Sequence, residues 1–249
     1  MTPHCRYVLR LADTSLILAQ RLGEWIGHGP ALEEDLGLAN VSLDLLGQAR
    51  MLLSYGGELE GRGRTEDDLA YQREESEYLN ATLVEQPNGD FGQTIVRQVL
   101  VDAWQIELYE RLQQSKDPRL AEIAAKAIKE TRYHLRYSAG WLVRLGDGTD
   151  ESHMRVQAAL DRLWPFTNEL FAADDVDREV AGAGIAPGPD ALQPAWSARV
   201  DEILHEARLV KPAIIPFGWQ GKQGRHSEHL GYILAEMQSL HRAHPGAAW

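Results

Sequence analysis

Cysteine is almost absent from this sequence, because Cys5 is the only one in 249 residues. A scaffold held by disulfides is therefore excluded, and a lone thiol favours a reducing compartment. No apolar run approaches the roughly 20 residues that a membrane span needs. The first 13 residues include Arg6, Arg10 and Asp13 and lack the apolar core of a signal peptide. We expect a cytoplasmic protein that does not enter a membrane.

Basic residues are also scarce. The chain has 25 Lys and Arg against 37 Asp and Glu, which gives a formal net charge of −12. A nucleic-acid-binding protein needs a basic face to displace counterions, so this class is excluded. The sequence has neither a Gly-x-Gly-x-x-Gly nor a Gly-x-Ser-x-Gly motif, so the dinucleotide-binding and hydrolase signatures are absent. Hydrophobic residues make up 44% and charged residues 25%, which is ordinary for a globular domain.

Helical periodicity runs through nearly the whole chain, and alternating strand patterns are absent. We predict seven helices, over residues 7–27, 30–55, 90–115, 117–145, 150–173, 191–209 and 227–243. A further short helix fits between residues 65 and 83, and residues 211–223 are expected to be irregular. The longest helices come early, and the connection between the second and third is long. This order predicts an all-α fold, a ferritin-like four-helix bundle with one crossover and additional C-terminal helices. We expect a single domain over residues 1–249, with the core bundle at about 7–146 and the C-terminal helices at about 150–249.

Helix ends carry recognisable signals. Pro30 suits the first turn of the second helix, and Gly56–Gly57 predicts the end of that helix. Asp90 with Gln93 resembles a capping box, and Asp117 precedes a proline in the same way. Pro165 should kink the fifth helix.

Several polar residues fall on stripes that should face the bundle core. Asp102 lies among apolar residues of the third helix, and His134 lies on the apolar stripe of the fourth. Asp44 lies at the edge of the apolar row of the second helix, which is formed by Leu36, Ala39, Leu43, Leu46 and Leu53. A buried carboxylate needs a partner or must lose its charge.

One interpretation is a di-iron carboxylate site, which takes a carboxylate from each of two helices and Glu-x-x-His from the other two. The match is incomplete. Asp44 is followed at the histidine position by Gly47, and Thr131 stands at the carboxylate position before His134. In the third helix, Asp102 stands at the carboxylate position. The first helix offers only Thr14 on its apolar stripe or Asp13 beside that stripe. Using Glu130 in place of Thr131 gives the wrong spacing. Because only three of six ligand positions are clearly filled, we favour a hydrogen-bonded core network of Asp44, Asp102 and His134, with Asn40 or Thr131 as further members.

Two weaker candidates lie near the C-terminus. His226, Glu228 and His229 could bind a metal, although Ser227 and Glu228 also make a good helix cap and first turn. The segment Gly221–Gly224, with Lys222, could contact a phosphate, but no strand precedes it, so a P-loop is excluded. The tryptophans are expected to be core or interface anchors.

Long stretches of the chain resemble a known family. They are residues 22–25, 43–50, 84–89, 127–136, 228–231 and 234–238, so the likeness extends nearly end to end. The sequence resembles the non-catalytic, ferritin-like C subunits of bacterial phenylacetyl-CoA epoxidases, which are ring 1,2-monooxygenases of aerobic phenylacetate degradation. The resemblance implies that Asp44 matches the glutamate of the first Glu-x-x-His motif and Gly47 its missing histidine. It likewise implies that Thr131 replaces the carboxylate of the second motif, that His134 is its retained histidine, and that Asp102 is the lone carboxylate.

The resemblance also implies partners. A homologous catalytic A subunit holds the di-iron centre, a small B subunit bridges the heterodimers, and a flavin and iron–sulfur reductase delivers electrons from NADPH. We expect no catalytic residue, no metal and no cofactor in this chain, a scaffolding role toward the A subunit, and a homodimer as an option for the chain alone. Two rival hypotheses remain. The chain could bind metal through Asp44, Asp102, Glu130 and His134 and act as an oxidoreductase, or it could bind acyl-CoA through Lys222 and Arg225.

Overall fold

The computed structural model describes residues 1–213 and 218–247, and within these ranges it contains helices and no strand. The predicted all-α, ferritin-like class is confirmed. The chain forms two compact units: unit 1 is Met1–Pro87 with Trp219–Trp249, and unit 2 is Asn88–Gly218. The prediction of one domain over residues 1–249 stays a prediction. None of the described helices is both long enough and apolar enough to span a membrane.

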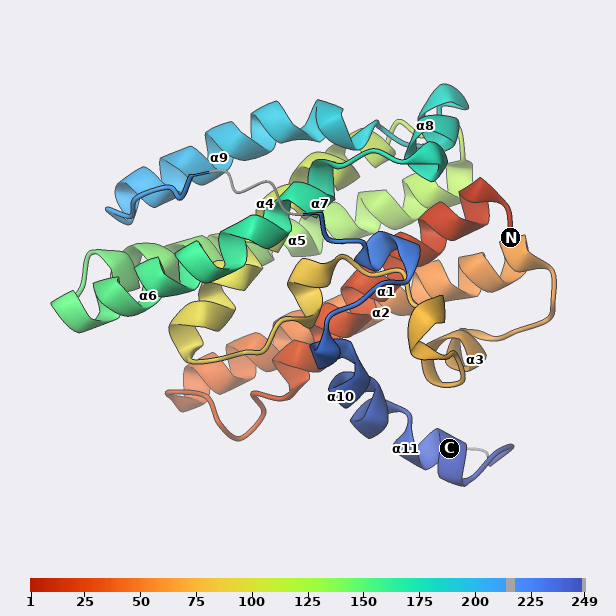
Figure 1. Ribbon diagram of the computed structural model, residues 1–249, viewed down its shortest axis with the longest axis horizontal. Coiled ribbons are helices and arrows are strands. Elements are labelled where there is room, and N and C mark those ends of the chain that lie inside the picture. Colours follow the sequence, from red (N-terminus) through yellow and green to blue (C-terminus); the bar gives the residue numbers. More distant parts are fainter. Residues whose placement is uncertain (214–217, 248–249) are drawn as a thin grey trace. The chain divides into compact units, whose positions relative to one another are not determined.

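Two long helices form the centre of unit 1, α1 (Pro3–Gly23) and α2 (Leu32–Glu60), and they pack along each other (Figure 1). Thr2 caps α1 by accepting from the backbone N–H of Cys5, so the helix begins earlier than predicted. The predicted first turn at Pro30 is also wrong. The helix begins at Leu32, and Asp35 instead accepts from the backbone N–H of Gly27 at 3.0 Å.

The predicted end of the second helix at Gly56–Gly57 is wrong as well. Both glycines lie inside α2, where Gly56 lies against Leu9 and Gly57 against the backbone of Arg64. A glycine within a helix costs about 1 kcal/mol, which tertiary packing easily offsets. The helix ends instead at Gly61, whose φ of 68° is the left-handed conformation of a helix C-terminus.

The apolar row expected in the core of α2 divides between the two sides of the helix. Leu53 is buried, but Leu36, Leu43 and Leu46 are exposed. The residues that actually pack inward form a different stripe: Leu38, Val41, Leu45, Ala49 and Leu52. Because leucines occupy both sides of α2, sequence periodicity alone could not identify the buried one.

Shorter elements complete unit 1. The predicted helix between residues 65 and 83 is a helix and two 3₁₀ turns, α3 (Glu66–Tyr71), η1 (Glu75–Glu77) and η2 (Thr82–Glu85). The C-terminal part adds η5 (Gly221–Gln223), α10 (Glu228–Met237) and α11 (Ser239–Ala243). Residues 214–217 of the segment predicted to be irregular lie outside the described residues.

Unit 2 is built on α4 (Phe91–Leu112) and α5 (Pro118–Gly146). The predicted caps are confirmed, because Asp90 accepts from the N–H of Gln93 at 2.9 Å and Asp117 from that of Leu120 at 3.1 Å. The side chain of Gln93 does not complete a capping box; it accepts from Arg162 instead.

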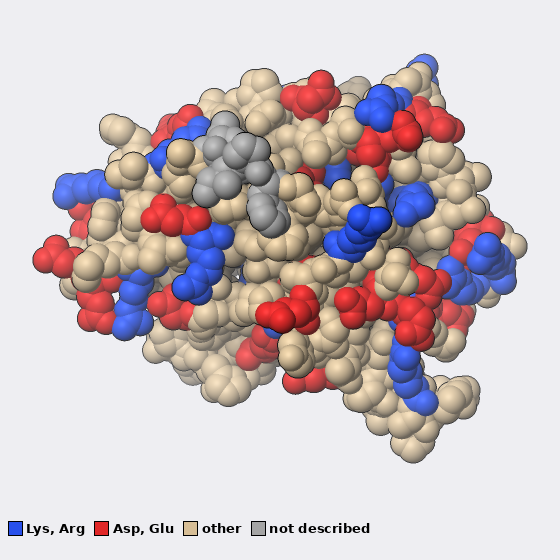
Figure 2. Space-filling view, in the orientation of Figure 1, with Lys and Arg blue, Asp and Glu red and all other residues tan. Residues whose placement is uncertain are grey.

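The rest of unit 2 follows in shorter pieces. They are α6 (Asp150–Leu163), η3 (Trp164–Thr167), α7 (Asn168–Phe171), α8 (Asp175–Gly182), η4 (Pro189–Leu192) and α9 (Gln193–Glu206). The α-helix α6 ends at Leu163 and a 3₁₀ turn begins at Trp164, which agrees with the break predicted at Pro165. Helix α8 was not predicted. Trp196 is a core anchor as expected, since its indole N–H donates to the carbonyl of Leu100 at 3.0 Å. On the face shown in Figure 2, acidic and basic side chains are interspersed and the basic ones form no continuous patch.

Candidate functional site

Asp102 lies fully buried on α4 in unit 2. Gln98 donates to one carboxyl oxygen at 2.6 Å and Ser138 of α5 to the other at 2.8 Å. Burial raises the pKa of Asp102 to about 8, although the two hydrogen bonds oppose the rise. The group is therefore mainly a neutral carboxylic acid at pH 7. Both carboxyl oxygens therefore already have hydrogen-bond partners within unit 2.

Thr131 and His134 are also fully buried, one turn apart on α5. The hydroxyl of Thr131 donates to the carbonyl of Ala127 at 3.0 Å, a bond within its own helix. The ring of His134 meets that of Tyr133 edge to face, with centroids 6.3 Å apart. Gln98 and Ser138 supply hydrogen bonds to both carboxyl oxygens of Asp102, and a bond between Asp102 and His134 stays a prediction.

Asp44 and Gly47 are half-buried on α2 and belong to unit 1. A Cβ atom added to Gly47 would meet nothing within 4 Å, so packing does not require glycine there. A network joining Asp44 to Asp102 and His134 stays a prediction. In residues 1–213 and 218–247, no three His, Cys, Asp or Glu side chains form a group that could hold a metal ion.

Asp13 and Thr14, the two positions of the first helix that were considered as metal ligands, instead bind a loop. Asp13 is fully buried and forms an ion pair with Arg73, whose side chain is 1% exposed. Asp13 also accepts from the backbone N–H of Leu79 at 2.8 Å, and Thr14 accepts from that of Ala81 at 3.2 Å. These bonds attach the segment between α3 and η2 to α1.

A second buried polar cluster in unit 1 was not predicted. Nδ1 of His226 lies 2.9 Å from Oε2 of Glu85, and Nε2 lies 2.8 Å from the carbonyl oxygen of Tyr78. Both ring nitrogens therefore face acceptors, which requires the doubly protonated imidazolium. Burial alone would lower the pKa of His226, but the hydrogen bond and charge of Glu85 outweigh it and raise the pKa.

Glu85 accepts further hydrogen bonds, one from nearby Asn80 and two from distant segments of the chain. Asn80 donates to it at 2.9 Å and the backbone N–H of Ser227 at 2.6 Å, while Arg21 of α1 donates to its carbonyl. Ser227 also caps α10, as expected. Both ring nitrogens of His226 are engaged in these hydrogen bonds, so His226 is not available as the first ligand of the metal site considered as an alternative for residues 226–229.

The glycines of the proposed phosphate-binding segment serve packing. Gly221 lies against the backbone of Asn80, and Gly224, with a φ of 82°, lies against that of Ser76. The carbonyl of Lys222 accepts from Arg10 at 2.9 Å. The glycine spacing was the only sequence signal for this packing role. The residues that Gly221 and Gly224 contact lie more than 140 positions earlier in the chain, so no local pattern could identify them.

Comparison with known proteins agrees with the resemblance seen in the sequence. Residues 1–249 match the family model described as phenylacetic acid catabolic protein. The chain is 55% identical over 243 residues to a protein of Escherichia coli (strain K12) that is named as the C subunit of 1,2-phenylacetyl-CoA epoxidase. The match covers 98% of each chain.

Proposed function

The chain belongs to the phenylacetic acid catabolic protein family, and from this premise we propose that it is the structural, non-catalytic subunit of a phenylacetyl-CoA epoxidase. Its proposed partners are a homologous catalytic subunit that carries the di-iron centre, a small bridging subunit and a reductase. The complex would work in the cytoplasm, adding one oxygen atom of O₂ across the aromatic ring of phenylacetyl-CoA. The role of this chain would be to hold the catalytic subunit in its active shape.

The observation that carries the non-catalytic role is that, within residues 1–213 and 218–247, no three His, Cys, Asp or Glu side chains lie close enough together to hold a metal ion. A di-iron centre needs several carboxylates and imidazoles that converge on one place, whereas both carboxyl oxygens of Asp102 accept hydrogen bonds from Gln98 and Ser138. Two further positions of the di-iron motif supply no metal ligand. Gly47 has no side chain, and the hydroxyl of Thr131 bonds to its own helix. The residues present therefore do not fit a di-iron centre, and no reaction step is assigned to them.

Metal analysis of the purified chain tests this role. The chain is loaded with Fe²⁺ without oxygen and desalted, and its iron is counted; we expect far less than one atom per chain. Asp102→Asn, which cannot ionise, is the matched comparison and should retain the same small amount. One to two iron atoms per chain, lost in Asp102→Asn, would contradict the proposal and favour an oxidoreductase.

The scaffolding role needs a separate experiment. The catalytic subunit is expressed with and without this chain, and its solubility, melting temperature and turnover are compared. We expect a large loss of all three when it is alone. A catalytic subunit that is stable and fully active alone would remove the need for a scaffold. Titration of this chain with phenylacetyl-CoA tests the acyl-CoA-binding alternative, for which we expect no saturable binding.

A further inference from the structure

A cavity of about 430 Å³ lies within unit 2, where α4, α5 and α9 pack together. Small-molecule sites typically have volumes of about 300–1,000 Å³. Apolar side chains from all three helices line it: Ile106 of α4, Leu135 and Ala139 of α5, and Ile203 of α9. Among the described residues, none of those considered for the di-iron motif or for phosphate binding belongs to this lining. The cavity is therefore separate from the site discussed above.

Five charged side chains also line the cavity, and three of them have ionic partners. Arg132 of α5 donates to Glu110 of α4 at 3.0 Å. Arg199 of α9 donates at 2.7 Å to Glu107, which is buried behind the lining. The charges of these residues are balanced within the protein, so they do not require a ligand.

The two remaining charged side chains, Arg136 of α5 and Glu202 of α9, are exposed at this cavity. In the part of the chain that the structure describes, neither forms an ion pair. The guanidinium of Arg136 lies over the ring of Tyr133, 5.4 Å from its centroid. The cavity thus offers one uncompensated positive charge and one uncompensated negative charge, on different helices, beside apolar walls.

We propose that this cavity binds a free amino acid with a large apolar side chain. Its carboxylate pairs with Arg136, because a guanidinium matches the two carboxylate oxygens in shape and charge. Its ammonium group pairs with Glu202, and its side chain covers the apolar walls. Since Arg136 and Glu202 belong to different helices, the bound ligand joins α5 to α9.

The chemistry of the lining favours this class over simpler ligands. A carboxylate without an amine would leave Glu202 beside an apolar ligand with no partner, and an amine without a carboxylate would leave Arg136 in that state. A small polar amino acid would satisfy both charges but leave the walls around Ile106 and Leu135 in contact with water. Only a ligand with all three features matches the whole lining.

Titration of the intact chain with L-phenylalanine, followed by NMR, tests the proposal. We expect saturable binding of one molecule per chain, and a melting temperature that rises with ligand concentration. Three analogues each lack one feature: 3-phenylpropionate has no amine, 2-phenylethylamine has no carboxylate, and L-alanine has no ring. Each should bind about fivefold more weakly or less well still.

Two variants assign the charges. Arg136→Met should weaken binding of L-phenylalanine about fivefold and leave that of 2-phenylethylamine unchanged. Glu202→Gln should weaken binding of L-phenylalanine by a similar factor and leave that of 3-phenylpropionate unchanged or tighter. Both side chains are exposed, so both variants should fold, which circular dichroism checks.

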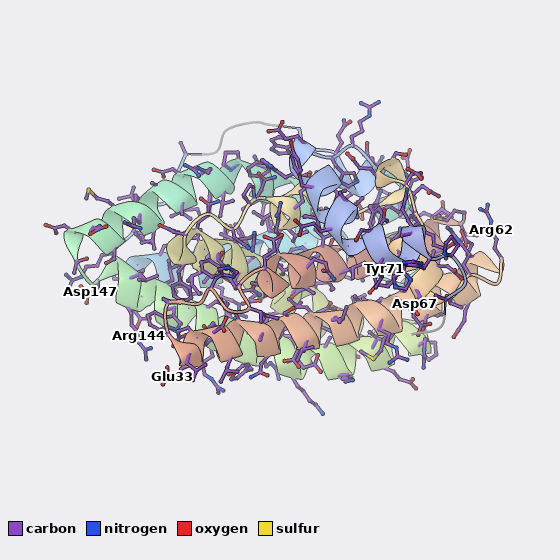
Figure 3. The ribbon with its side chains drawn as sticks, turned by 90° about the horizontal axis from the view of Figure 1, so that it is seen from below. Glu33, Arg62, Asp67, Tyr71, Arg144 and Asp147 are labelled. Carbon is purple, nitrogen blue, oxygen red and sulfur yellow. The ribbon has the colours of Figure 1, made fainter. Side chains whose placement is uncertain are left out.

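Each variant has a matched control on the same helix. Figure 3 shows Arg144 near the end of α5, where Asp147 follows the helix. Arg144 is exposed and lies over the ring of Trp141 at 5.3 Å, as Arg136 lies over Tyr133, but it does not line the cavity. Arg144→Met should therefore leave binding unchanged. Glu206→Gln, one turn after Glu202 on α9 and outside the lining, should also have no effect.

Three results would overturn the proposal. One is the absence of saturable binding of L-phenylalanine up to its solubility limit. Another is equal affinity for 3-phenylpropionate or 2-phenylethylamine, which would show that one of the two charges is not recognised. The third is an equal effect of Arg136→Met and Arg144→Met, which would place the ligand elsewhere. None of these results bears on whether the chain is catalytic, so the inference and the proposed function fail separately.

Discussion

Nδ1 of His226 lies 2.9 Å from Oε2 of Glu85, and neither side chain is exposed to solvent. The two residues are 141 positions apart in the chain, and their contact attaches the segment before α10 to η2. Nε2 of His226 also lies next to an acceptor, the carbonyl oxygen of Tyr78. Because both ring nitrogens face acceptors, the contact favours the charged imidazolium.

This pair predicts a loss of stability with rising pH. The pKa of His226 is raised in the folded protein, so the native state binds the proton more tightly than the unfolded chain does. The contribution is fully present below the unfolded pKa of about 6.5 and is lost as the pH rises through the folded value. Urea unfolding between pH 5 and about 9 should show this decline.

The matched variants for this prediction are His226→Gln and His28→Gln. Replacing His226 should cost about 3 kcal/mol at pH 6, because Glu85 is left buried without its cation, and should flatten the pH dependence. His28 is exposed, so its replacement should leave both quantities unchanged. An unaltered pH profile in His226→Gln would show that another group titrates.

A second prediction concerns Asp13 and Arg73. Arg73→Met should destabilise unit 1 by about 3–5 kcal/mol, since Asp13 would remain buried without its partner. The double variant Asp13→Asn with Arg73→Met should lose less than the sum of the two single losses. Arg62→Met serves as the control, because that side chain is 67% exposed and its ion pair with Glu60 spans 3.8 Å. Chemical denaturation of the wild-type protein, the two single variants and the double variant measures the coupling, and additive losses would show that the two side chains act independently.

A third prediction follows from the neutral state of Asp102. Its folded pKa of about 8 lies above the unfolded value of about 3.9, so the native state retains a proton that the unfolded chain releases. Stability should therefore fall as the pH rises from about 4 to about 8. Asp102→Asn removes this decline and keeps acceptor and donor atoms for Gln98 and Ser138. We expect it to stabilise the protein by about 1–3 kcal/mol at pH 8 and by little at pH 4.

The control for Asp102 is Asp161→Asn, at an exposed position of α6. Urea unfolding at pH 4 and pH 8 should show no comparable difference for it. Equal or lower stability of Asp102→Asn at pH 8 would mean that Asp102 is ionised in the folded protein and needs its charge.

A fourth prediction separates structure from chemistry at His134. His134→Ala should destabilise the fold by about 2–4 kcal/mol, because a fully buried ring is replaced by a cavity. Turnover per assembled epoxidase complex should be unchanged, and total activity should fall only as assembly falls. His134→Gln, which retains more of the volume, should lose less stability. Low turnover in a complex that is fully assembled would assign His134 a chemical role.

The sequence by itself determined the helical class, because the 3.6-residue period and the caps at Asp90, Asp117 and Ser227 are local signals. It also identified Asp102, Thr131 and His134 as inward-facing, and all three are buried. It misassigned the exposed leucines of α2, because both sides of that helix are apolar and periodicity cannot choose between them. Tertiary structure alone decided the partners: Asp102 with Gln98 and Ser138, Asp13 with Arg73, and Glu85 with His226. Except for the bond from Gln98, these contacts join residues 36 to 141 positions apart, and no local pattern encodes which buried charge meets which.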